Sequence, residues 1–330
     1  MIQKSDGLEA ARTLIKLRNQ APPLLFTEQT EPYFPLSLSQ ERLLALEQLN
    51  TTTPLYNLRY AFHLKGDLDI DSLNRSLGMV LNRQQVLRTI FGMAEGQPKQ
   101  IIQPSQSVDV DVIDFSAMPF EQAKVRIIAE LDQPFNLQEE PGFRYRLYRS
   151  GVDEHVVSFA FHHIISDYWS ENLFFKEFSR YYAAFAEGNE ANLKPLPIRY
   201  ADFSLWQRQW LSQAGVLEFL LGYWHPRLQG LAQPDLPADQ ASTGESERRI
   251  EFKKITIAAE QVTALKQLAR QTKVKTFTIL LTALKLTLAE YLKTGDVAVF
   301  SPVTSRHRPE LQNLMGDFSN LLILRSDLSG

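Results

Sequence analysis

His162-His163-Ile164-Ile165-Ser166-Asp167-Tyr168-Trp169-Ser170 is the stretch of sequence that decides how this chain folds and what it does. The residues before it, 155–161, alternate in polarity and are rich in Val and Phe, which predicts a strand. The residues after it, 169–185, have amphipathic spacing and predict a helix. The two imidazoles therefore lie where a strand enters a turn, a common place for functional side chains. Imidazole is the side chain best suited to moving a proton near neutral pH.

Composition restricts the function classes. The chain has 330 residues, enough for one large or two ordinary domains, with 44% hydrophobic and 22% charged residues. Its net charge is −3 without a long basic run, which disfavours sequence-independent nucleic-acid binding. Because Cys is absent, disulfides, thiolate nucleophiles and Cys-ligated metals are excluded. We expect a cytoplasmic protein, since no apolar stretch approaches the roughly 20 residues of a membrane span and no signal peptide is visible.

Periodicity predicts an α/β fold with mixed sheets rather than a doubly wound domain. Helices are expected over residues 8–19, 40–49, 71–82, 120–131, 169–185, 200–213, 216–228, 259–271 and 277–292. Strands are expected over residues 56–65, 87–91, 99–103, 108–113, 143–149, 155–161, 249–257, 297–302 and 321–327. Ser39 is the expected N-cap of its helix. The strongly apolar helix 277–292 is expected to lie in the core.

Five motifs in a fixed order resemble those of one family. His162-His163-x-x-x-Asp167, followed by an aromatic residue and Ser170, resembles the HHxxxDG signature of the condensation domains of nonribosomal peptide synthetases, which belong to the wider chloramphenicol-acetyltransferase-like superfamily. The other four cover most of the chain: 37–43 resembles SxAQxRL, 83–91 resembles RHExLRTxF, 200–206 resembles YxDYAVW, and 305–321 resembles NRxRxEL…IGxFVNT.

The chain departs from the family pattern in several places. Gln84 and Gln85 stand where the family usually has His and Glu, and Tyr168 replaces the Gly of HHxxxDG. The fifth motif reads GDFSN at 316–320. Its GDF portion resembles the heterocyclization branch, but that branch replaces the His pair by Asp residues. Family members also continue beyond Gly330, so a second lobe truncated at the C-terminus is expected.

The resemblance implies a fold of two pseudo-related, chloramphenicol-acetyltransferase-like lobes in a V with a tunnel between them. The expected segments are an N-terminal helix and linker (1–34), an N-terminal lobe (35–190), a helical connection and crossing segment (191–248) and a partial C-terminal lobe (249–330). Donor and acceptor peptidyl carrier proteins would deliver thioesters on phosphopantetheine arms, with an adenylation domain nearby. The domain itself would bind no cofactor, nucleic acid or membrane, and would be monomeric.

The resemblance also implies roles for single residues. His163 is the expected catalytic residue. His162 should be buried and structural, because adjacent residues of a strand face opposite sides. Asp167 is expected to pair with Arg306, and Asp167 or Ser166 can also act as an N-cap for the following helix. No metal site is expected, because ligands on one strand face need i, i+2 spacing. The expected tunnel-lining residues are Tyr168, Trp169, Ser170 and Asn320.

Three functions compete at this stage. The first is amide formation between carrier-bound groups, an acyltransfer that the fragment itself could lack. The second is ester formation onto a hydroxyl acceptor. The third is a non-catalytic docking domain, which the Tyr168 substitution and the altered fifth motif favour. The sequence names neither substrate. We predict that Tyr168 has a negative φ in the first helical turn, because a bulky residue at positive φ is strained.

Overall fold

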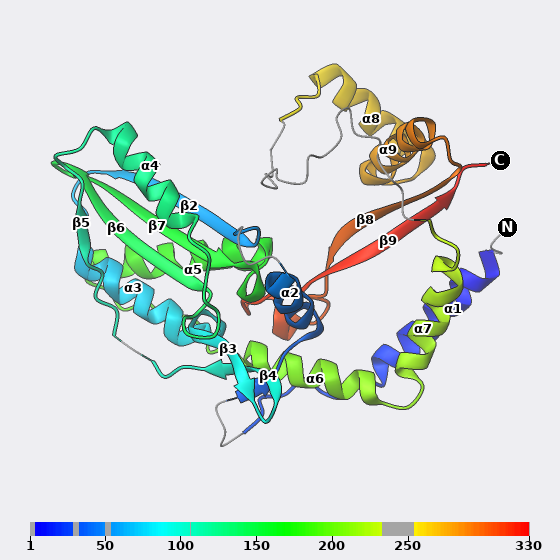
Figure 1. Ribbon diagram of the computed structural model, residues 1–330, viewed down its shortest axis with the longest axis horizontal. Coiled ribbons are helices and arrows are strands. Elements are labelled where there is room, and N and C mark those ends of the chain that lie inside the picture. The colour runs from blue at the N-terminus through cyan, green and yellow to red at the C-terminus, as the bar shows by residue number, and fades with distance from the viewer. Residues whose placement is uncertain (1–3, 29–32, 50–53, 106, 233–253, 330) are drawn as a thin grey trace. The chain divides into compact units, whose positions relative to one another are not determined.

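The computed structural model describes residues 4–28, 33–49, 54–105, 107–232 and 254–329. The chain divides into two compact units (Figure 1). Unit 1 comprises residues 1–217 and 304–320, and unit 2 comprises residues 218–303 and 321–330. The segment 304–320, which carries most of the fifth motif, therefore packs with the N-terminal part of the chain. The four sequence segments expected above remain a prediction.

Helices and strands alternate irregularly, which confirms the mixed α/β class. In chain order they are α1 (Lys4–Asn19), β1 (Tyr33–Pro35), α2 (Leu38–Leu49), β2 (Asn57–Lys65), α3 (Ile70–Arg83), η1 (Gln85–Arg88), β3 (Thr89–Ala94), β4 (Gln97–Ile102), β5 (Val112–Asp114), α4 (Phe120–Leu131), β6 (Phe143–Gly151), β7 (Glu154–His162), η2 (His163–Ile165), α5 (Tyr168–Ala186), α6 (Tyr200–Ser212), α7 (Val216–Leu228), α8 (Ala259–Thr272), α9 (Thr276–Leu292), β8 (Asp296–Thr304), η3 (Pro309–Leu311) and β9 (Ser319–Asp327).

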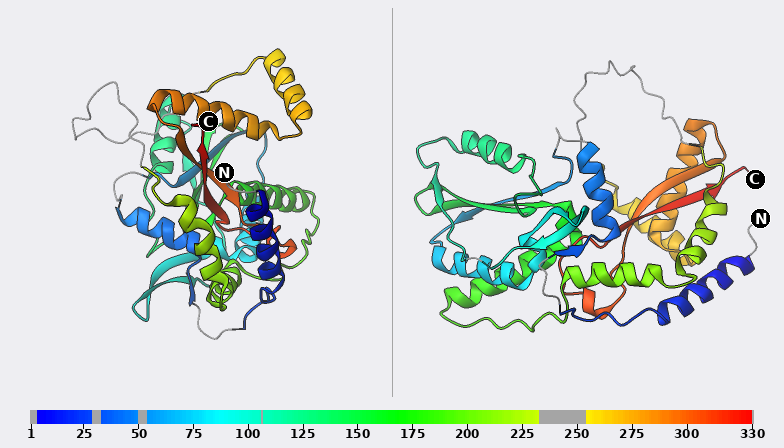
Figure 2. Two further views of the ribbon diagram at one scale, coloured as in Figure 1. Left: turned by 90° about the vertical axis from the view of Figure 1, so that its right-hand side faces the viewer. Right: turned by 60° about the horizontal axis from the view of Figure 1, so that its bottom comes forward.

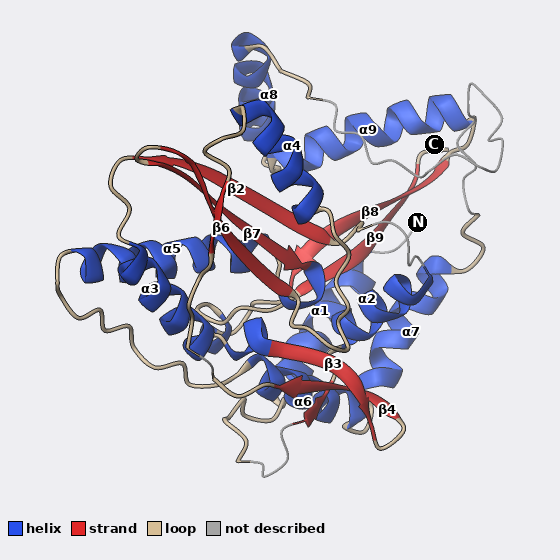
Figure 3. Ribbon diagram, turned by 60° about the vertical axis from the view of Figure 1, so that its left-hand side comes forward, coloured by secondary structure: helices blue, strands red, loops and turns tan. Residues whose placement is uncertain are grey.

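The main sheet of unit 1 has the strand order β2-β7-β6-β5. β7 pairs antiparallel with both β2 and β6, and β5 pairs parallel with β6. Helix α4 covers one face of this sheet, while α3 and α5 lie against the other (Figure 3). Because helices cover both faces, nearly every residue of β7 is buried. β7 is thus the best-supported strand, and it delivers the His pair at its C-terminal end.

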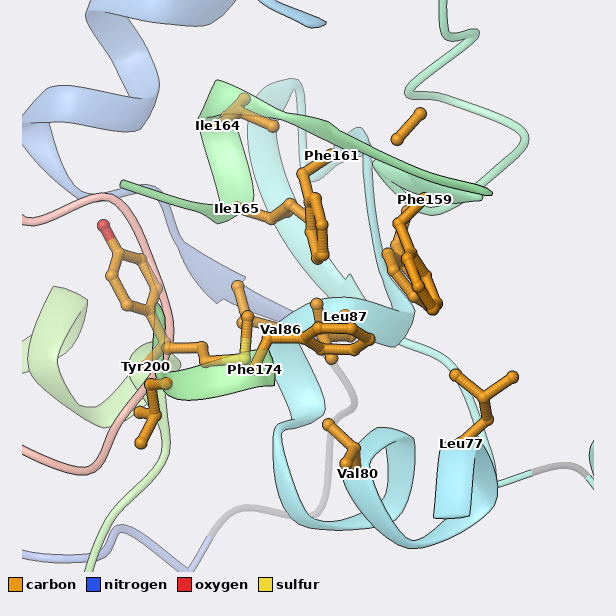
Figure 4. Packing of buried hydrophobic residues seen from close by; sticks show 14 of the residues in the cluster. Leu77, Val80, Val86, Leu87, Phe159, Phe161, Ile164, Ile165, Phe174 and Tyr200 are labelled. Atoms are coloured by element: carbon orange, nitrogen blue, oxygen red, sulfur yellow. The ribbon is translucent and has the colours of Figure 1, made fainter. Parts of the chain in front are cut away.

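Aromatic side chains fill the space between β7 and α5 (Figure 4). The ring of Phe174 on α5 meets the rings of Phe159 and Phe161 nearly edge-on, at centroid distances of 5.3 and 5.0 Å. Edge-to-face aromatic pairs stabilise a core by about 0.5–1.5 kcal/mol beyond the area that they bury. This packing fixes α5 against the strand, and with it the turn that joins them.

Two smaller sheets complete the fold. β1, β4 and β3 form a three-stranded antiparallel sheet in unit 1. In unit 2, β8 pairs with β9, and Figure 2 shows both strands as long, twisted ribbons. The guanidinium of Arg325 on β9 binds the carboxylate of Asp296 on β8 at 2.6 Å. Lys285 of α9 donates a hydrogen bond to Ser326 of β9 at 2.7 Å, which fixes the helix against the sheet.

Most predicted elements are confirmed, including the hairpin of β6 and β7 and the helix α5 that follows the His pair. The cap prediction for Ser39 is wrong, because α2 already begins at Leu38. Instead the hydroxyl of Ser37 accepts the Gln40 N–H at 3.2 Å. The predicted strand 249–257 lies partly outside the described residues, and its described part, 254–257, forms no strand.

The prediction that the apolar helix 277–292 lies in the core is also wrong. Helix α9 leaves Phe277, Leu280 and Leu284 exposed by 55%, 43% and 47%. Of its residues only Lys285 is fully buried. Composition alone indicated burial here, but the described residues supply no layer that covers this face of the helix.

Candidate active site

The turn after β7 is held by backbone hydrogen bonds from both flanking segments. The His162 N–H donates to the carbonyl of Gly142 at 2.7 Å, and the His163 N–H donates to the carbonyl of Tyr56 at 2.8 Å. A Cβ on Gly142 would lie 3.1 Å from the Cβ of His162, so the two segments approach too closely here for a larger residue to fit without a small displacement. Backbone hydrogen bonds alone therefore hold the main chain of both His residues in place.

His162 is fully buried. Its Nδ1 accepts the Ile164 N–H at 3.1 Å, which caps the 3-10 turn η2. Its Nε2 lies 3.5 Å from Oε2 of Glu47, and the ring of Phe135 meets the imidazole edge-on. These contacts enclose the His162 ring completely, so none of it is open to solvent.

His163 begins the 3-10 turn and points differently from its neighbour. Its side chain is 32% exposed, and its Nδ1 lies 3.8 Å from Oδ1 of the fully buried Asp317. Nδ1 itself is buried and has no hydrogen-bond partner among the described residues. The exposed surface of the ring therefore lies away from Nδ1, toward Nε2. A half-buried imidazole with one nitrogen toward a carboxylate and the other toward solvent can accept a proton from a bound group.

A buried ionic network closes the start of α5. Asp167 is the N-cap of this helix, because its Oδ1 accepts the Ser170 N–H at 2.8 Å. The guanidinium of Arg306 donates to the same oxygen at 3.0 Å and to the Ser170 hydroxyl at 2.6 Å. It also donates to the carbonyls of Leu311 and Leu314, each at 2.6 Å. The two residues that the family pattern pairs are thus in direct contact, while their support of the site stays a prediction.

Burial lowers the pKa of Arg306, and the charge of Asp167 opposes this effect. The guanidinium also lies over the ring of Phe318 at 4.0 Å from the ring centroid. Ser170, which was expected to line the substrate path, is fully buried. Its hydroxyl instead accepts the N–H of Gly316 at 3.0 Å. Ser170 thus links the helix start to the fifth motif.

The other motifs hold the fifth motif in place. Gln84 accepts the Met315 N–H through its Oε1 at 3.0 Å. Ser39 and Tyr200 both donate hydroxyl hydrogen bonds to the carbonyl of Asp317, at 2.9 and 2.5 Å. Gly316 has φ +151°, and a Cβ there would lie only 1.9 Å from the ring of Tyr200. Contacts from the first, second, third and fourth motifs therefore position the carboxylate of Asp317 beside His163.

Two carboxyl groups near His163 are buried. Burial raises the pKa of Asp317, although the charge of His163 and the hydrogen bonds from Ser319 lower it. Burial also raises the pKa of Glu171, with a hydrogen bond from Tyr60 and the charge of His163 acting in the opposite direction. Ionising either carboxyl group therefore costs free energy because of burial, and a positive charge on the nearby imidazole would lower that cost.

The remaining predicted lining residues lie at the surface or beside a small cavity. Tyr168 is 81% exposed, and Trp169 is 50% exposed with its indole N–H donating to the Gln312 carbonyl at 2.9 Å. Asn320 lines a cavity of about 110 Å³ together with Arg42 and Asp317. Tyr168 is the first residue of α5 and is not among the residues of positive φ, so the prediction for its backbone is confirmed.

Two kinds of feature are absent from the described residues. No group of three or more His, Asp or Glu side chains lies close enough there to hold a metal ion. No helix within these ranges is long and apolar enough to cross a membrane.

Sequence reasoning missed three residues of this site. Asp317 was noticed as a departure from the family pattern but received no role. Glu171 follows the signature on α5, yet its burial and its hydrogen bond from Tyr60 depend on tertiary packing. Gln40 is buried in the first motif and donates to the Ile164 carbonyl at 3.3 Å, so it supports the turn directly. Only the GDF departure could have signalled one of these contacts in advance.

The fold and the site together define the class of protein. The chain is similar to the X-domain from teicoplanin biosynthesis solved in complex with OxyB, with a TM-score of 0.84, 25% identity, and coverage of 94% of this chain and 68% of that one. The first condensation domain of the CDA synthetase has the same fold, with a TM-score of 0.70, 19% identity, and coverage of 90% and 71%. The prediction of a chloramphenicol-acetyltransferase-like fold is thereby confirmed.

Within this class, the chain belongs to the condensation domain family, whose model matches residues 30–330. It is 37% identical over 306 residues to a component of the linear gramicidin synthase of Brevibacillus parabrevis and 36% identical over 301 residues to phosphinothricin tripeptide synthetase PhsC from Streptomyces viridochromogenes. These matches cover 91% and 88% of this chain but only 4% and 27% of those synthetases. The predicted membership of the nonribosomal peptide synthetase condensation domains is confirmed.

Proposed function

We propose that this chain catalyses the attack of an aminoacyl amine on an acyl or peptidyl thioester, which forms an amide, with His163 as the catalytic residue. The observation that carries the proposal is the geometry of this imidazole. Its Nδ1 is buried near a carboxylate, and the rest of its 32% exposed side chain is open to a ligand. The membership of the condensation domain family supports the same reaction.

The reaction needs no enzyme nucleophile, because a thioester is already activated. The amine lone pair attacks the carbonyl carbon, the new C–N bond forms, and the π electrons move to the carbonyl oxygen. His163 Nε2 takes a proton from the attacking nitrogen. The intermediate then collapses, the C–S bond breaks, and the leaving thiolate takes that proton from the imidazolium. Positioning of the two reactants supplies most of the remaining acceleration.

Asp167, Arg306 and His162 act on this site through the backbone. His162 caps the turn that carries His163, and the Asp167–Arg306 pair ties the start of α5 to the fifth motif. We assign these three residues a structural role. Tyr168, Trp169 and Asn320 are the proposed residues along the substrate path.

The proposed partners are the donor and acceptor peptidyl carrier proteins of a synthetase in the cytoplasm, with an adenylation domain adjacent. Their phosphopantetheine arms would carry the substrates, and the domain itself would hold no cofactor. The multidomain synthetases among the relatives support this setting. The same site could also accept a hydroxyl group, which would give an ester.

The test uses the purified chain with N-acetylcysteamine thioesters, a panel of N-acylated aminoacyl donors against aminoacyl and hydroxyacyl acceptors, with products weighed by mass spectrometry. We expect amide products, and we expect His163→Ala to lower their rate by about 10²–10⁴-fold, the usual contribution of a general base. His63→Ala is the matched control, because His63 lies on β2 in a pair with Glu154. Equal rates for His163→Ala and the unmodified chain, or no product from any pair, would remove the catalytic proposal.

One observation favours a second function. The similar X-domain structure is a complex with another protein, OxyB. We propose, as the alternative, a domain that recruits a partner protein without chemistry of its own. This alternative predicts that His163→Ala leaves the output of the assembled synthetase unchanged.

A further inference from the structure

Asp317 stands out from the rest of the site, because its carboxyl group is fully buried and incompletely paired. Its Oδ1 accepts the backbone N–H and the hydroxyl of Ser319, at 2.9 and 2.5 Å. Its Oδ2 has no hydrogen-bond partner within the described ranges. A buried carboxyl oxygen without a partner is costly, so such an oxygen in a folded protein calls for a reason.

Nδ1 of His163 is an unpaired polar atom of opposite character close to this carboxyl group. It lies 3.8 Å from Oδ1 of Asp317 and is likewise buried without a partner in the described parts of the chain. Charge-assisted hydrogen bonds between nitrogen and carboxylate oxygen are about 2.7–2.9 Å long. A shift of roughly 1 Å, within the reach of a side-chain torsion, would bring Nδ1 of His163 to this distance from the Asp317 carboxylate and give Nδ1 a hydrogen-bond acceptor.

The Asp317 backbone is held so that the carboxyl group stays in this place. Its carbonyl accepts hydroxyl hydrogen bonds from Tyr200 and Ser39, and Gly316 before it has a φ that only glycine adopts easily. The neighbouring carboxylate of Asp167 is neutralised by Arg306, whereas no described Lys or Arg forms an ion pair with Asp317. The Nδ1–H of His163 is therefore the hydrogen-bond donor that the arrangement leaves for Asp317.

We propose that Asp317 is a positioning residue for His163: its carboxylate accepts the Nδ1–H of the imidazole and thereby keeps the Nε2 lone pair free to take a proton from the substrate. The second nitrogen of a His decides which tautomer reacts, and a carboxylate on that nitrogen fixes both the tautomer and the ring orientation. The inference rests on the proposed catalytic role of His163 and adds to it a group that the HHxxxDG signature does not contain.

A purely local role is the competing explanation, because Asp317 also accepts the Ser319 N–H two residues later, as in an Asx turn. The two explanations differ in whether the tautomer of His163 depends on the negative charge of Asp317. A local turn needs only an oxygen acceptor, which Asn supplies. The positioning role needs the carboxylate charge, so Asp317→Asn should disturb the imidazole while leaving the turn intact.

The first measurement is a long-range ¹H–¹⁵N correlation spectrum of the ¹⁵N-labelled chain, which distinguishes the Nδ1–H and Nε2–H tautomers. The chain has six His residues, and the signals of His163 are assigned by their absence in His163→Ala. We expect the Nδ1–H tautomer in the unmodified protein and a loss of its dominance in both Asp317→Asn and Asp317→Ala. Asp202→Asn is the control, because Asp202 is another buried carboxylate of unit 1 that binds Arg199. It should leave the His163 signals in place.

The second measurement is the amide-forming rate with the N-acetylcysteamine thioesters used above. Asp317→Asn should lower kcat by at least about tenfold with little change in KM, because a general base in the wrong tautomer loses part of its contribution of about 10²–10⁴-fold. If His163→Ala abolishes the rate while Asp317→Asn changes neither the spectrum nor kcat, His163 remains catalytic and the role of Asp317 is wrong. If Asp317→Asn changes the spectrum but His163→Ala keeps the full rate, the catalytic proposal is wrong.

Discussion

Arg306 is the residue whose loss should cost this fold most. Its side chain is 2% exposed, and its guanidinium donates to Asp167, to Ser170 and to the carbonyls of Leu311 and Leu314. Arg306→Ala leaves a buried carboxylate without its cation and two buried carbonyls without their donor. Removing one member of a buried ion pair costs about 3–5 kcal/mol. Since 1 kcal/mol corresponds to about 2–4 °C in Tm for a domain of this size, the expected loss is about 10 °C.

The assay is thermal and urea unfolding followed by Trp fluorescence. Trp169 is a suitable reporter, because its indole N–H donates to Gln312 in the segment that Arg306 holds. Arg306→Lys should lose less than Arg306→Ala, since Lys keeps the charge but not the forked donors. In the double variant with Asp167→Asn, the loss should be smaller than the sum of the single losses. The control is Lys65→Ala, which breaks the exposed Lys65–Glu154 pair and should cost less than 1 kcal/mol. A loss below about 1 kcal/mol for Arg306→Ala would refute the argument.

Three further predictions follow from the same geometry. Gly316→Ala should destabilise the fold by about 3–5 kcal/mol in a thermal scan. The new Cβ would lie only 1.9 Å from the Tyr200 ring, and the φ of this residue is one that glycine adopts easily. The control is Gly222→Ala within α7, which should be neutral or stabilising because a Cβ there would meet no atom within 4 Å. Glu171→Gln should raise Tm at pH 7.5: burial raises the pKa of Glu171, so the folded state loses stability as pH rises from the ordinary Glu pKa through the raised one. The difference should vanish on acidification to about pH 4, near the ordinary pKa, and a Tm gain that persists there would contradict this. Tyr168→Gly should keep or increase amide formation, since the ring is 81% exposed at the first residue of α5; loss of activity with an unchanged Tm would instead make Tyr168 part of the mechanism.

The local structure around the His pair could be predicted because short-range patterns determine it. Alternation over 155–161 specified β7, and the spacing after Asp167 specified α5. His162 is buried because it is the last residue of β7, which helices cover on both faces, whereas His163 lies beyond the strand in η2 and is partly exposed. The helix α9 shows the limit of this approach, because apolar composition does not reveal which other layer is present to cover a helix.

The role of Asp317 could not be predicted, because it depends on contacts between segments far apart in the sequence. Gln84 binds the backbone N–H of Met315, and Ser39 and Tyr200 bind the carbonyl of Asp317, so three distant residues hold this segment beside His163. Each of these residues belongs to one of the motifs, but a single motif carries no information on its contacts with the others. A pattern of residue types records that a segment is constrained without recording which side chain the constraint delivers to the site.

Those contacts also explain how the chain tolerates its departure in the second motif. Gln84 stands where the family usually has His, and it is fully buried. Its Oε1 accepts the Met315 N–H at 3.0 Å, while its Nε2 donates to the carbonyl of Asn313 at 3.0 Å and to the carboxylate of Glu177 at 3.1 Å. A side-chain amide offers both an acceptor and two donors without titrating, so this anchor of the fifth motif keeps its hydrogen bonds at any pH near neutrality.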